Sequence, residues 1–464
     1  MKHEDIKEIL LNEDYLSKEV VVCGWVRTIR RSKNMSFVEL NDGTSLKNLQ
    51  LVIDNSDDKN KEFFASLNVG SSIAVKGNLV ESMNKNQKVE LNVKQAELLG
   101  DCPKDYPIQK KKQNMEFLRE IPHLRTRTNT FNAVFKVRNT LAKAAHDYFQ
   151  EHNFTYVNTP IITGSDCEGA GEMFRVTTLD IDEISKGAYN PNINEKDFFG
   201  KKVGLTVSGQ LEAEALACSL GKVYTFGPTF RAENSNTRRH AAEFWQIEPE
   251  IAFADLDDII DLQTDLIKYM MKKVLKECPD EIAFFTRFYD HTLFDRMVNV
   301  IESDFGRIDY TDAIKLLEES GKEFEYPVYW GCDLKSEHER YLTDIVYKKP
   351  VFVTNYPKEL KSFYMKQNAD GKTVASTDLL VPGIGEMIGA SQREDNFELL
   401  EKRIQELDMT EEDYLWYLDL RKYGTVPHSG FGIGFERLVM YTTGMDNIRD
   451  TIPFPRTKCK LLKL

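Results

Sequence analysis

The chain has 464 residues, of which 41% are hydrophobic and 29% are charged, and this length and composition predict two or three globular domains. Its formal net charge of −13 argues against indiscriminate binding to nucleic acid, because a polyanion is attracted by basic surface. The N-terminus has acidic residues throughout and no apolar run near the ~20 residues that a membrane span needs. We therefore expect a cytoplasmic protein with no membrane partner.

The cysteines do not indicate a disulfide framework or a structural zinc site. There are seven, an odd number, and no two form a C-x-x-C pair. We expect them to be reduced thiols.

The first part of the chain has the pattern of a small β-barrel. Between residues 20 and 99, short β-rich runs alternate with turn residues such as Asn41-Asp42-Gly43, which is typical of a barrel of the OB type. A polar, charged stretch follows. We predict an OB-type domain over residues 1–100 and a linker over residues 101–130.

A second domain is predicted over residues 131–464. It begins with a long amphipathic helix over residues 131–152. Strand-like runs joined by polar loops then alternate with helical stretches, which favours an α+β fold with a largely antiparallel sheet flanked by helices. Segments near residues 180–203 and 278–348 fit this pattern poorly and are interpreted as insertions. No glycine-rich P-loop or dinucleotide fingerprint follows a strand.

A polar hairpin is the first candidate for a binding site. The segment GPTFRAENSNTRRHAAEFWQIEPE (227–250) contains a strand that ends near Arg231, a basic loop and a returning strand with Phe244. Arg231, Arg238 and His240 could present positive charge to several phosphates, and Phe244 offers a ring on which a base could stack. Considered alone, a basic hairpin loop is more often solvated surface.

A glycine-rich strand is the second candidate. In HSGFGIGFERLVMYTTG (428–444), Gly430, Gly432 and Gly434 would let the backbone pack closely or approach a ligand before Glu436 opens a helix. Glycines in a strand also mark bulges, so this segment alone is weak support for a site.

Together these two segments resemble motifs 2 and 3 of the class II aminoacyl-tRNA synthetases. The long helix and FTYVNTPIIT (154–163) resemble motif 1, with Pro160 at the position of the family's dimer-interface proline. Further strings resemble asparaginyl-tRNA synthetases of the bacterial type: SDCEGAGEMFRV (165–176), LTVSGQLEAE (205–214), GEMIGASQRE (385–394) and YGTVPHSGFGIGFERL (423–438). The resemblance covers nearly the whole chain. It implies an ATP-dependent ligase that joins L-asparagine to tRNA(Asn) and forms a homodimer.

The resemblance implies an ATP site built on motifs 2 and 3. Arg231 would hold the α-phosphate and the carboxylate of the amino acid, and Glu233 would accept a hydrogen bond from the adenine amino group. Phe244 and Arg437 would stack on the two faces of adenine, and His240 would reach the outer phosphates. Arg231 and Arg437 are the expected catalytic residues.

The resemblance also implies bound Mg²⁺. Asp378 and Glu386 match the carboxylates that hold this ion in the family, and hard carboxylate oxygens suit it. Glu386 therefore also belongs to the expected ATP site. The alternative for Glu386 is an ordinary turn carboxylate beside glycines.

The amino-acid pocket implied by the resemblance is polar. Glu168, Ser208 and Gln210 would surround the α-ammonium group, Arg393 would hold the side-chain oxygen, and Glu248 beside it would accept from the amide NH2. The alternative for Glu248 is a strand carboxylate paired with a neighbour. For Ser208 and Gln210 the alternative is a helix N-terminal cap.

The barrel would select the tRNA. Phe37 matches the aromatic residue that stacks on an anticodon base, Gln50 matches the amide that reads the central uridine, and Arg30 is expected at the same anticodon site. The alternative for Phe37 is a place in the barrel core, which the alternation around it leaves open.

Two other functions are compatible with parts of this pattern. Aspartyl-tRNA synthetases share the barrel, the motifs and Arg393, but they carry a lysine where this chain has Ala213 and an aspartate where it has Glu248; both differences favour a neutral amide substrate. A paralogue that does not act on tRNA, either an amide-forming ligase or a regulatory binding protein, typically lacks the barrel or the motif arginines. This chain has both.

Overall fold

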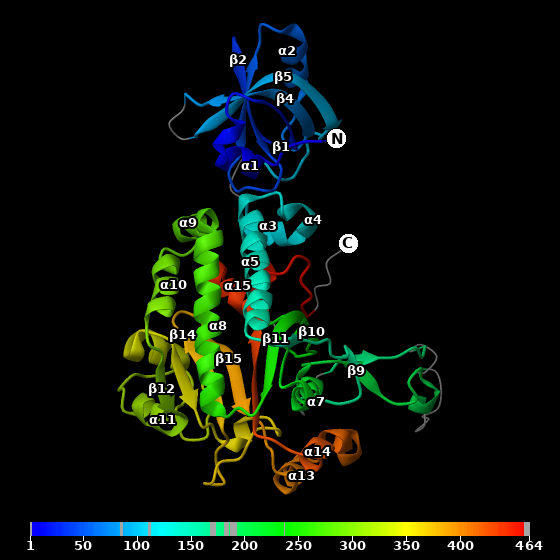
Figure 1. The fold of residues 1–464 in the computed structure, drawn as a ribbon, viewed down its shortest axis with the longest axis vertical. Coiled ribbons are helices and arrows are strands. Elements are labelled where there is room, and N and C mark those ends of the chain that lie inside the picture. The colour runs from blue at the N-terminus through cyan, green and yellow to red at the C-terminus, as the bar shows by residue number, and fades with distance from the viewer. Residues whose placement is uncertain are drawn as a thin grey trace. The chain divides into compact units, whose positions relative to one another are not determined.

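The computed structural model describes residues 2–83, 87–109, 113–167, 173–180, 185, 193–235 and 237–458. The chain divides into two compact units, Met1–Phe135 and Lys136–Leu464 (Figure 1). Within the described part of the chain, no helix combines the length and the apolar character that crossing a membrane requires. The cysteines of these residues are free thiols.

The first unit is built around a closed barrel with the strand order β1-β2-β3-β5-β4. The strands are β1 (Glu19–Arg31), β2 (Met35–Asn41), β3 (Leu49–Asp54), β4 (Ser72–Glu81) and β5 (Val89–Gly100). The barrel closes because β1 pairs with both β2 and β4, and only β3 and β5 run parallel. The predicted OB-type barrel is confirmed.

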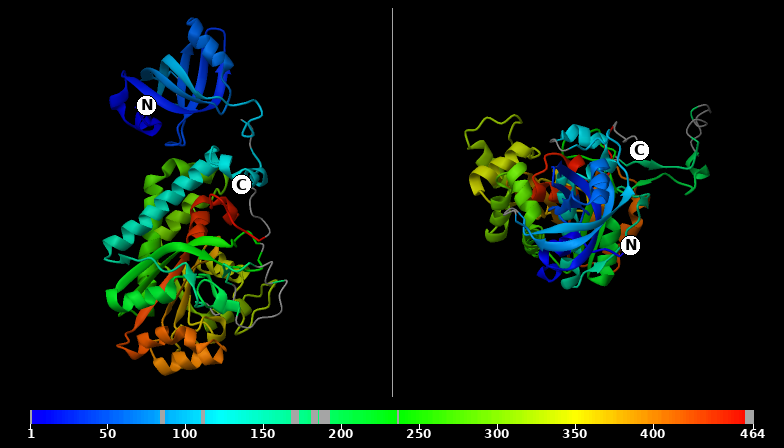
Figure 2. Two further views of the ribbon diagram at one scale, coloured as in Figure 1. Left: turned by 90° about the vertical axis from the view of Figure 1, so that its right-hand side faces the viewer. Right: turned by 90° about the horizontal axis from the view of Figure 1, so that it is seen from above.

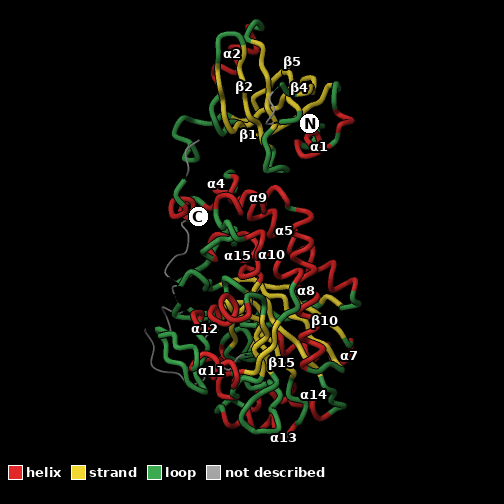
Figure 3. The backbone as a smooth tube through the Cα atoms, turned by 90° about the vertical axis from the view of Figure 1, so that its left-hand side faces the viewer, coloured by secondary structure: helices red, strands yellow, loops and turns green. Residues whose placement is uncertain are grey.

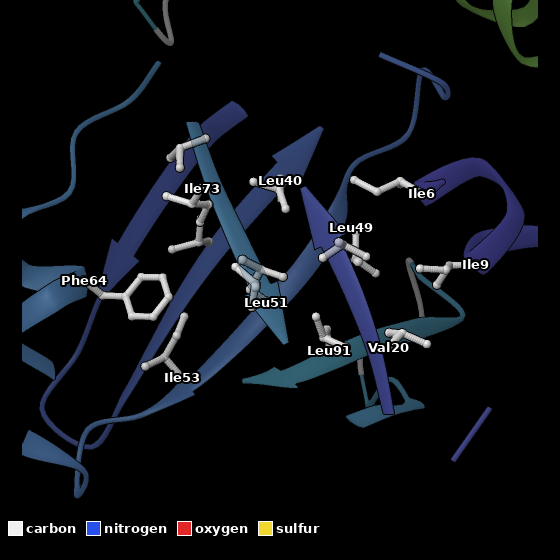
Figure 4. Close-up of a cluster of buried hydrophobic side chains, with 14 of the residues drawn as sticks. Ile6, Ile9, Val20, Leu40, Leu49, Leu51, Ile53, Phe64, Ile73 and Leu91 are labelled. Atoms are coloured by element: carbon white, nitrogen blue, oxygen red, sulfur yellow. The ribbon is translucent and has the colours of Figure 1, made fainter. Parts of the chain in front are cut away.

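Alternating side chains fill the barrel. On β2, Ser36, Val38 and Leu40 point inward and are buried, whereas Phe37 and Glu39 are partly exposed. The inward residues of the other strands join Leu40 in one core, shown in Figure 4. Helices α1 (Ile6–Leu11) and α2 (Asp58–Ser66) add buried side chains to this core. Phe37 therefore lies outside the core, which settles the alternative left open by the sequence.

The stretch expected to be a linker contains short helices. These are α3 (Met115–Glu120) and α4 (Pro122–Arg125), and α5 (Asn129–Glu151) begins directly after them. Asn114 caps α3 by accepting a hydrogen bond from the backbone N–H of Glu116 at 3.1 Å, which satisfies a helix N-terminus that has no internal partner.

The second unit contains an eight-stranded sheet in the order β12-β13-β14-β15-β16-β11-β10-β6. The strands are β6 (Thr155–Tyr156), β10 (Lys222–Phe230), β11 (Glu243–Ala252), β12 (Gly306–Asp309), β13 (Val351–Thr354), β14 (Ser376–Val381), β15 (Gly385–Gln392) and β16 (His428–Gly434). The central pairs are antiparallel, and only the two edge pairs, β12–β13 and β10–β6, are parallel. The α+β class predicted from the sequence is confirmed.

Two long helices pack beside the sheet (Figure 3). On α5, Phe149 stacks on Tyr224 of β10 with ring centroids 4.6 Å apart. The second helix, α8 (Leu256–Glu277), begins with a capping box at Asp255 and contacts β14, β15 and β16. Tyr148 and Tyr269 join the two helices, with ring centroids 5.2 Å apart.

The segment 278–348 is part of the fold of the second unit. It supplies the edge strand β12, and it forms α9 (Pro279–Phe288), α10 (Leu293–Glu302), α11 (Tyr310–Glu318), α12 (Ser336–Arg340) and the π-helical η3 (Tyr341–Tyr347). Its apolar side chains form a core with residues of β13 and β14. The sequence pattern missed this because β12 is short and its parallel partner β13 is distant in the sequence.

The remaining elements surround the large sheet. Strands β7 (Ile162–Thr163), β8 (Arg175–Val176) and β9 (Val203–Leu205) form a small separate sheet, and much of the expected insertion 180–203 lies outside the described residues. The helices include α7 (Gln210–Leu220), α13 (Phe397–Glu406), α14 (Leu415–Lys422) and α15 (Phe435–Thr443). Helices α13 and α14 pack together, in orange in Figure 2.

Candidate active site

One cavity of the second unit collects side chains from β11, β14, β15, β16, the starts of α7 and α15, and the loop that follows β10. Its volume is about 350 Å³. The predicted catalytic, ATP-binding, amino-acid-binding and metal-binding residues of the described chain all line it: Ser208, Gln210, Arg231, Glu233, His240, Phe244, Glu248, Asp378, Glu386, Arg393 and Arg437. Glu168 lies outside the described residues.

The polar hairpin forms one wall of the cavity. Arg231 directly follows β10, and its guanidinium carbon lies 5.5 Å from the centroid of the Phe244 ring. Glu233 lies between two basic groups, 3.9 Å from Arg231 Nη1 and 3.8 Å from His240 Nε2. His240 Nδ1 and Thr237 Oγ1 share a hydrogen bond of 2.5 Å. This wall therefore offers cationic groups and a ring to a nucleotide.

Two carboxylates on the adjacent strands β14 and β15 form another part of the site. Lys361 Nζ donates to both oxygens of Asp378, at 2.8 and 2.7 Å. Arg437 Nη1 donates to the backbone oxygen and to Oε2 of Glu386, at 2.9 and 3.3 Å. Burial raises the pKa of Asp378, whereas at Glu386 the charges of Arg437 and Lys361 outweigh burial and lower the pKa. Burial and the charge of Glu386 raise the pKa of a third carboxylate, Glu339, to about 7.

Asp378 and Glu386 fit a hard divalent cation. A Cβ atom built on Gly389 would lie 3.4 Å from Glu386 Oε1 and 3.7 Å from Asp378 Oδ1, so the two oxygens converge above a residue without a side chain. Mg²⁺ prefers such oxygen ligands. No group of three or more His, Cys, Asp or Glu side chains in the described ranges is placed to hold a metal. An ion at this pair would therefore need oxygen atoms from phosphate or water to complete its coordination.

Arg393 is held by a buried ion pair. Its Nε donates to Glu250 Oε2 at 3.1 Å and its Nη2 to Glu250 Oε1 at 2.5 Å, while Nη1 donates to Ser391 Oγ at 2.7 Å. One N–H on each terminal nitrogen is left for a ligand. The sequence predicts Glu248 beside Arg393 as an acceptor for the substrate amide, and that role stays a prediction. The ion-pair partner of Arg393 is Glu250, two residues further along the same face of β11.

A second buried carboxylate, Glu214 on α7, supports this pair. It lies 3.8 Å from Arg393 Nε. Its oxygens have four further polar neighbours: Gln210 Nε2 at 3.0 Å, Tyr417 OH at 2.6 Å, Arg421 Nη2 at 3.0 Å and His428 Nε2 at 3.0 Å. At Glu214, Arg421 and His428 outweigh burial and lower the pKa, whereas burial raises the pKa of Glu250 against the opposing charge of Arg393. Because Gln210 donates its amide to Glu214, only its carbonyl oxygen remains to accept from an ammonium group.

Glu248 is bound by three donors and still lines the cavity. Ser208 Oγ donates to Oε1, and the Gly209 N–H and Thr225 Oγ1 donate to Oε2 at 3.1 and 3.2 Å. Ser208 Oγ also accepts from the backbone N–H of Gln210 at 3.1 Å, at the start of α7. An ionised carboxylate has about four acceptor positions, so one remains for a ligand. Glu248 is therefore a strand carboxylate paired with its neighbours, whereas the N-cap residue of α7 is Gly209; a role of Glu248, Ser208 and Gln210 in ligand binding stays a prediction.

Ala213 lies away from the cavity lining. It is buried in a small apolar cluster with Ala217 and Val223. A lysine at this position would place its charged group in the apolar cluster unless the side chain reached out to the cavity, and burying an unpaired charge there costs free energy.

Gly430 explains how Glu250 reaches Arg393. In the sheet register, Gly430 lies between Glu250 on β11 and Ser391 on β15. A Cβ atom on Gly430 would lie 2.1 Å from Glu250 Oε1. We expect Gly430→Ala to lower the free energy of unfolding by ~1–3 kcal/mol through overpacking, as measured by chemical denaturation. Gly432→Ala is the control, because its nearest neighbour would be 3.7 Å away; equal stability of the two variants would contradict this explanation.

The first unit has its own candidate site on the outer face of the barrel. Arg30 lies opposite Phe37 in the β1–β2 register, and its guanidinium carbon is 4.7 Å from the ring centroid. Gln50 on β3 donates to Glu90 of β5 at 3.2 Å. The three predicted anticodon residues therefore lie on strands β1, β2 and β3, outside the core.

Comparisons with known proteins agree with the fold of both units. A family described as class II tRNA synthetases (D, K and N) matches residues 114–458, and an OB-fold nucleic acid binding domain matches residues 20–99. An asparagine–tRNA ligase of Clostridium kluyveri is 57% identical over 96% of each chain. The chain belongs to the class II tRNA synthetases, as an asparagine–tRNA ligase.

Solved class II synthetases have the same fold. The asparaginyl-tRNA synthetase of Pyrococcus horikoshii complexed with asparaginyl-adenylate has a TM-score of 0.86 with this chain, at 34% identity and 99% coverage of both. The aspartyl enzyme of Entamoeba histolytica has a TM-score of 0.79 at 22% identity, which shows likeness of fold alone.

Sequence reasoning about this ligase missed several residues at the site. Glu214, Glu250 and Lys361 are bound directly to predicted residues, and Arg138 on α5 forms a 2.8 Å ion pair with the buried Glu436. Only Glu250 could have been found from the sequence: it is two residues from Glu248 on a predicted strand, so both side chains lie on the same face. The other pairs join distant segments.

Proposed function

We propose that this ligase activates L-asparagine with ATP and transfers the asparaginyl group to tRNA(Asn), releasing pyrophosphate and AMP. The observation that supports this most is the single cavity, in which a buried arginine with two available N–H groups lies together with an aromatic ring, two cationic side chains and a carboxylate pair. An amino acid and a nucleotide could react within it.

Charge in the buried part of the site favours asparagine over aspartate. Arg393 would donate to the side-chain oxygen of either substrate. The acceptor position left on Glu248 suits the amide NH2 of asparagine, whereas it would face a second carboxylate if aspartate were bound, and two buried carboxylates repel each other. The two amino acids are nearly isosteric, so hydrogen-bond polarity has to separate them.

The reaction needs no protein nucleophile. The carboxylate oxygen of asparagine would attack the α-phosphorus and the bond to pyrophosphate would break. A terminal ribose hydroxyl of the tRNA would then attack the acyl carbon and AMP would leave. Arg231 and Arg437 would position the reacting groups and offset the charge that develops on phosphate oxygens. Phe244 would stack on adenine, and Glu233 would accept from its amino group.

Asp378 and Glu386 are the residues that would hold Mg²⁺. Bound there, the ion would neutralise negative charge on the phosphate groups. His240 would contact the outer phosphates. Lys361, which holds Asp378 in this structure, would have to share that carboxylate with the ion.

The substrate assignment is tested by pyrophosphate exchange. We expect exchange with asparagine to exceed that with aspartate or lysine by orders of magnitude, on the scale of ~10⁴ for sites that read substrate hydrogen-bonding groups. Charging of tRNA(Asn) transcript with each amino acid is the second readout. Equal exchange with aspartate would refute the substrate proposal but leave the synthetase chemistry intact.

The barrel is proposed to bind the anticodon through Phe37, Gln50 and Arg30. Stacking of a base on an aromatic side chain contributes ~1–3 kcal/mol, so Phe37→Ala should weaken charging of tRNA(Asn) by about ten-fold or more, and Gln50→Ala should also weaken it. Neither change should affect pyrophosphate exchange, because both residues lie in a unit with its own core. Phe63→Ala, which removes another aromatic ring of the same unit, is the control and should leave the charging of tRNA(Asn) unchanged. Exchange reduced as much as charging would contradict the anticodon role.

A homodimer is proposed to form through the C-terminal part of α5 and the segment reaching Pro160. The supporting observation is that Tyr156 in this segment and Ile161 and Ile162 directly after it are exposed by 41–44% and that β6 is a sheet edge. A single protomer mass in sedimentation at micromolar concentration, with full activity, would refute it. A cytoplasmic location stays a prediction from the sequence.

A further inference from the structure

Helix α12 lies against the turn that joins the two strands of the carboxylate pair. Asp378 is on β14 and Glu386 is the second residue of β15, so the intervening turn 382–384 determines where the Glu386 side chain starts. This helix belongs to the segment 278–348, to which neither the motifs nor the sequence pattern gives a role.

Three side chains from α12 and η3 bind this turn. Arg340 Nη2 donates to the backbone oxygen of Gly383 at 2.9 Å. The Gly383 N–H donates to Asp344 Oδ1 at 2.9 Å. The Glu386 N–H donates to Glu339 Oε2 at 3.2 Å. Both polar groups of Gly383 and the amide of Glu386 are therefore fixed by two consecutive helical elements, α12 and η3.

Gly385 lets Glu339 approach this closely. A Cβ atom on Gly385 would lie 2.1 Å from Glu339 Oε2, and its φ of +92° is one that other residues rarely adopt. The close contact between Glu339 and the start of β15 therefore requires a glycine at position 385.

The same helix contacts the polar hairpin. Arg239, which lines the cavity, donates from Nη1 to Ser336 Oγ at 3.0 Å. Helix α12 thus touches both the basic wall and the strand turn that carries Glu386.

We propose that Glu339 is a positioning residue for the divalent cation, holding the backbone of Glu386 so that its carboxylate converges with that of Asp378. The proposal rests on the proposed function of these two carboxylates. Glu339 acts through Glu386 and not as a ligand, since no group of three carboxylates in the described chain is placed to hold a metal. Partners of metal ligands change affinity by about 10–100-fold when they are removed.

The test is Mn²⁺ binding, followed by electron paramagnetic resonance in the presence of a non-hydrolysable ATP analogue. Glu339→Ala should weaken Mn²⁺ binding by about ten-fold or more and raise the Mg²⁺ concentration needed for half-maximal pyrophosphate exchange. Glu339→Gln keeps an oxygen that can accept from the Glu386 N–H, so it should recover most of the affinity. Binding of the analogue without metal should be unchanged.

Glu337→Ala is the matched control. Glu337 is on the same helix, but its carboxylate accepts from the backbone N–H groups of Glu325 and Tyr326, at 3.1 and 2.8 Å. Equal Mn²⁺ affinities for Glu339→Ala and Glu337→Ala would overturn the proposal. So would Glu339→Gln binding as weakly as Glu339→Ala, because negative charge and not positioning would then be the cause.

A further variant covers the case in which Glu339→Ala does not fold. Arg340 is exposed and donates to the turn oxygen of Gly383, and Arg340→Ala should weaken Mn²⁺ binding in the same direction; unchanged binding would overturn the proposal. Wild-type protein that binds neither the analogue nor Mn²⁺ would instead refute the proposed function.

Discussion

Arg231→Ala should abolish asparagine-dependent pyrophosphate exchange. Arg231 follows the last residue of β10, lines the cavity and faces Phe244, which is where a donor to phosphate oxygens would be needed. Removing one donor to developing charge costs about 2.7–4 kcal/mol of barrier, or about 10²–10³-fold in rate. The measurement is exchange at saturating ATP and asparagine.

Lys222→Ala is the control for this variant, because Lys222 is an exposed cation at the other end of the same strand. It should leave exchange unchanged. A folded Arg231→Ala protein with near-normal exchange would mean that Arg231 does not contact the reacting groups.

Arg393→Ala should lower stability and remove asparagine activation together. The guanidinium is buried with Glu250 and near Glu214, and removing one partner of a buried ion pair costs about 3–5 kcal/mol. Denaturant unfolding and pyrophosphate exchange measure the two effects. Because the variant changes both properties, its loss of activity has two possible causes: a less stable fold or the loss of the contact between Arg393 and the substrate.

A double variant separates these two roles. Arg393→Met with Glu250→Gln removes both charges and replaces them with groups of similar size, and such replacements of buried pairs are often neutral in stability. We expect stability near that of the wild type and exchange still absent. Restored exchange would show that Arg393 supports the fold but does not bind the substrate side chain.

Local pattern in the sequence was sufficient for several features. Strict alternation around Phe37 predicts a strand with one inward face, and the barrel follows from five such runs joined by turns. The alternation could not decide which face is inward, because an aromatic residue suits either side; the closure of β1 on β4 decided it.

Other parts of the fold depend on pairing between distant segments. The segment 278–348 fits the sheet pattern of the sequence poorly, because its strand β12 is four residues long and has no hairpin partner. Its parallel partner β13 begins more than 40 residues later, and such a pairing leaves no local signature.

The sequence by itself determined the family, the motif residues and their types, since motif strings record chemistry at fixed spacing. Only the tertiary structure decided which of these residues touch. Glu248 and Glu250 share one strand face, so periodicity treats them alike; the register that aligns Glu250, Gly430 and Ser391 on three adjacent strands selects Glu250 as the partner of Arg393. The same holds for Lys361 with Asp378 and for Glu339 with the backbone N–H of Glu386. These contacts arise because the sheet brings together segments far apart in the chain, and a buried charge is stable only where such a partner meets it.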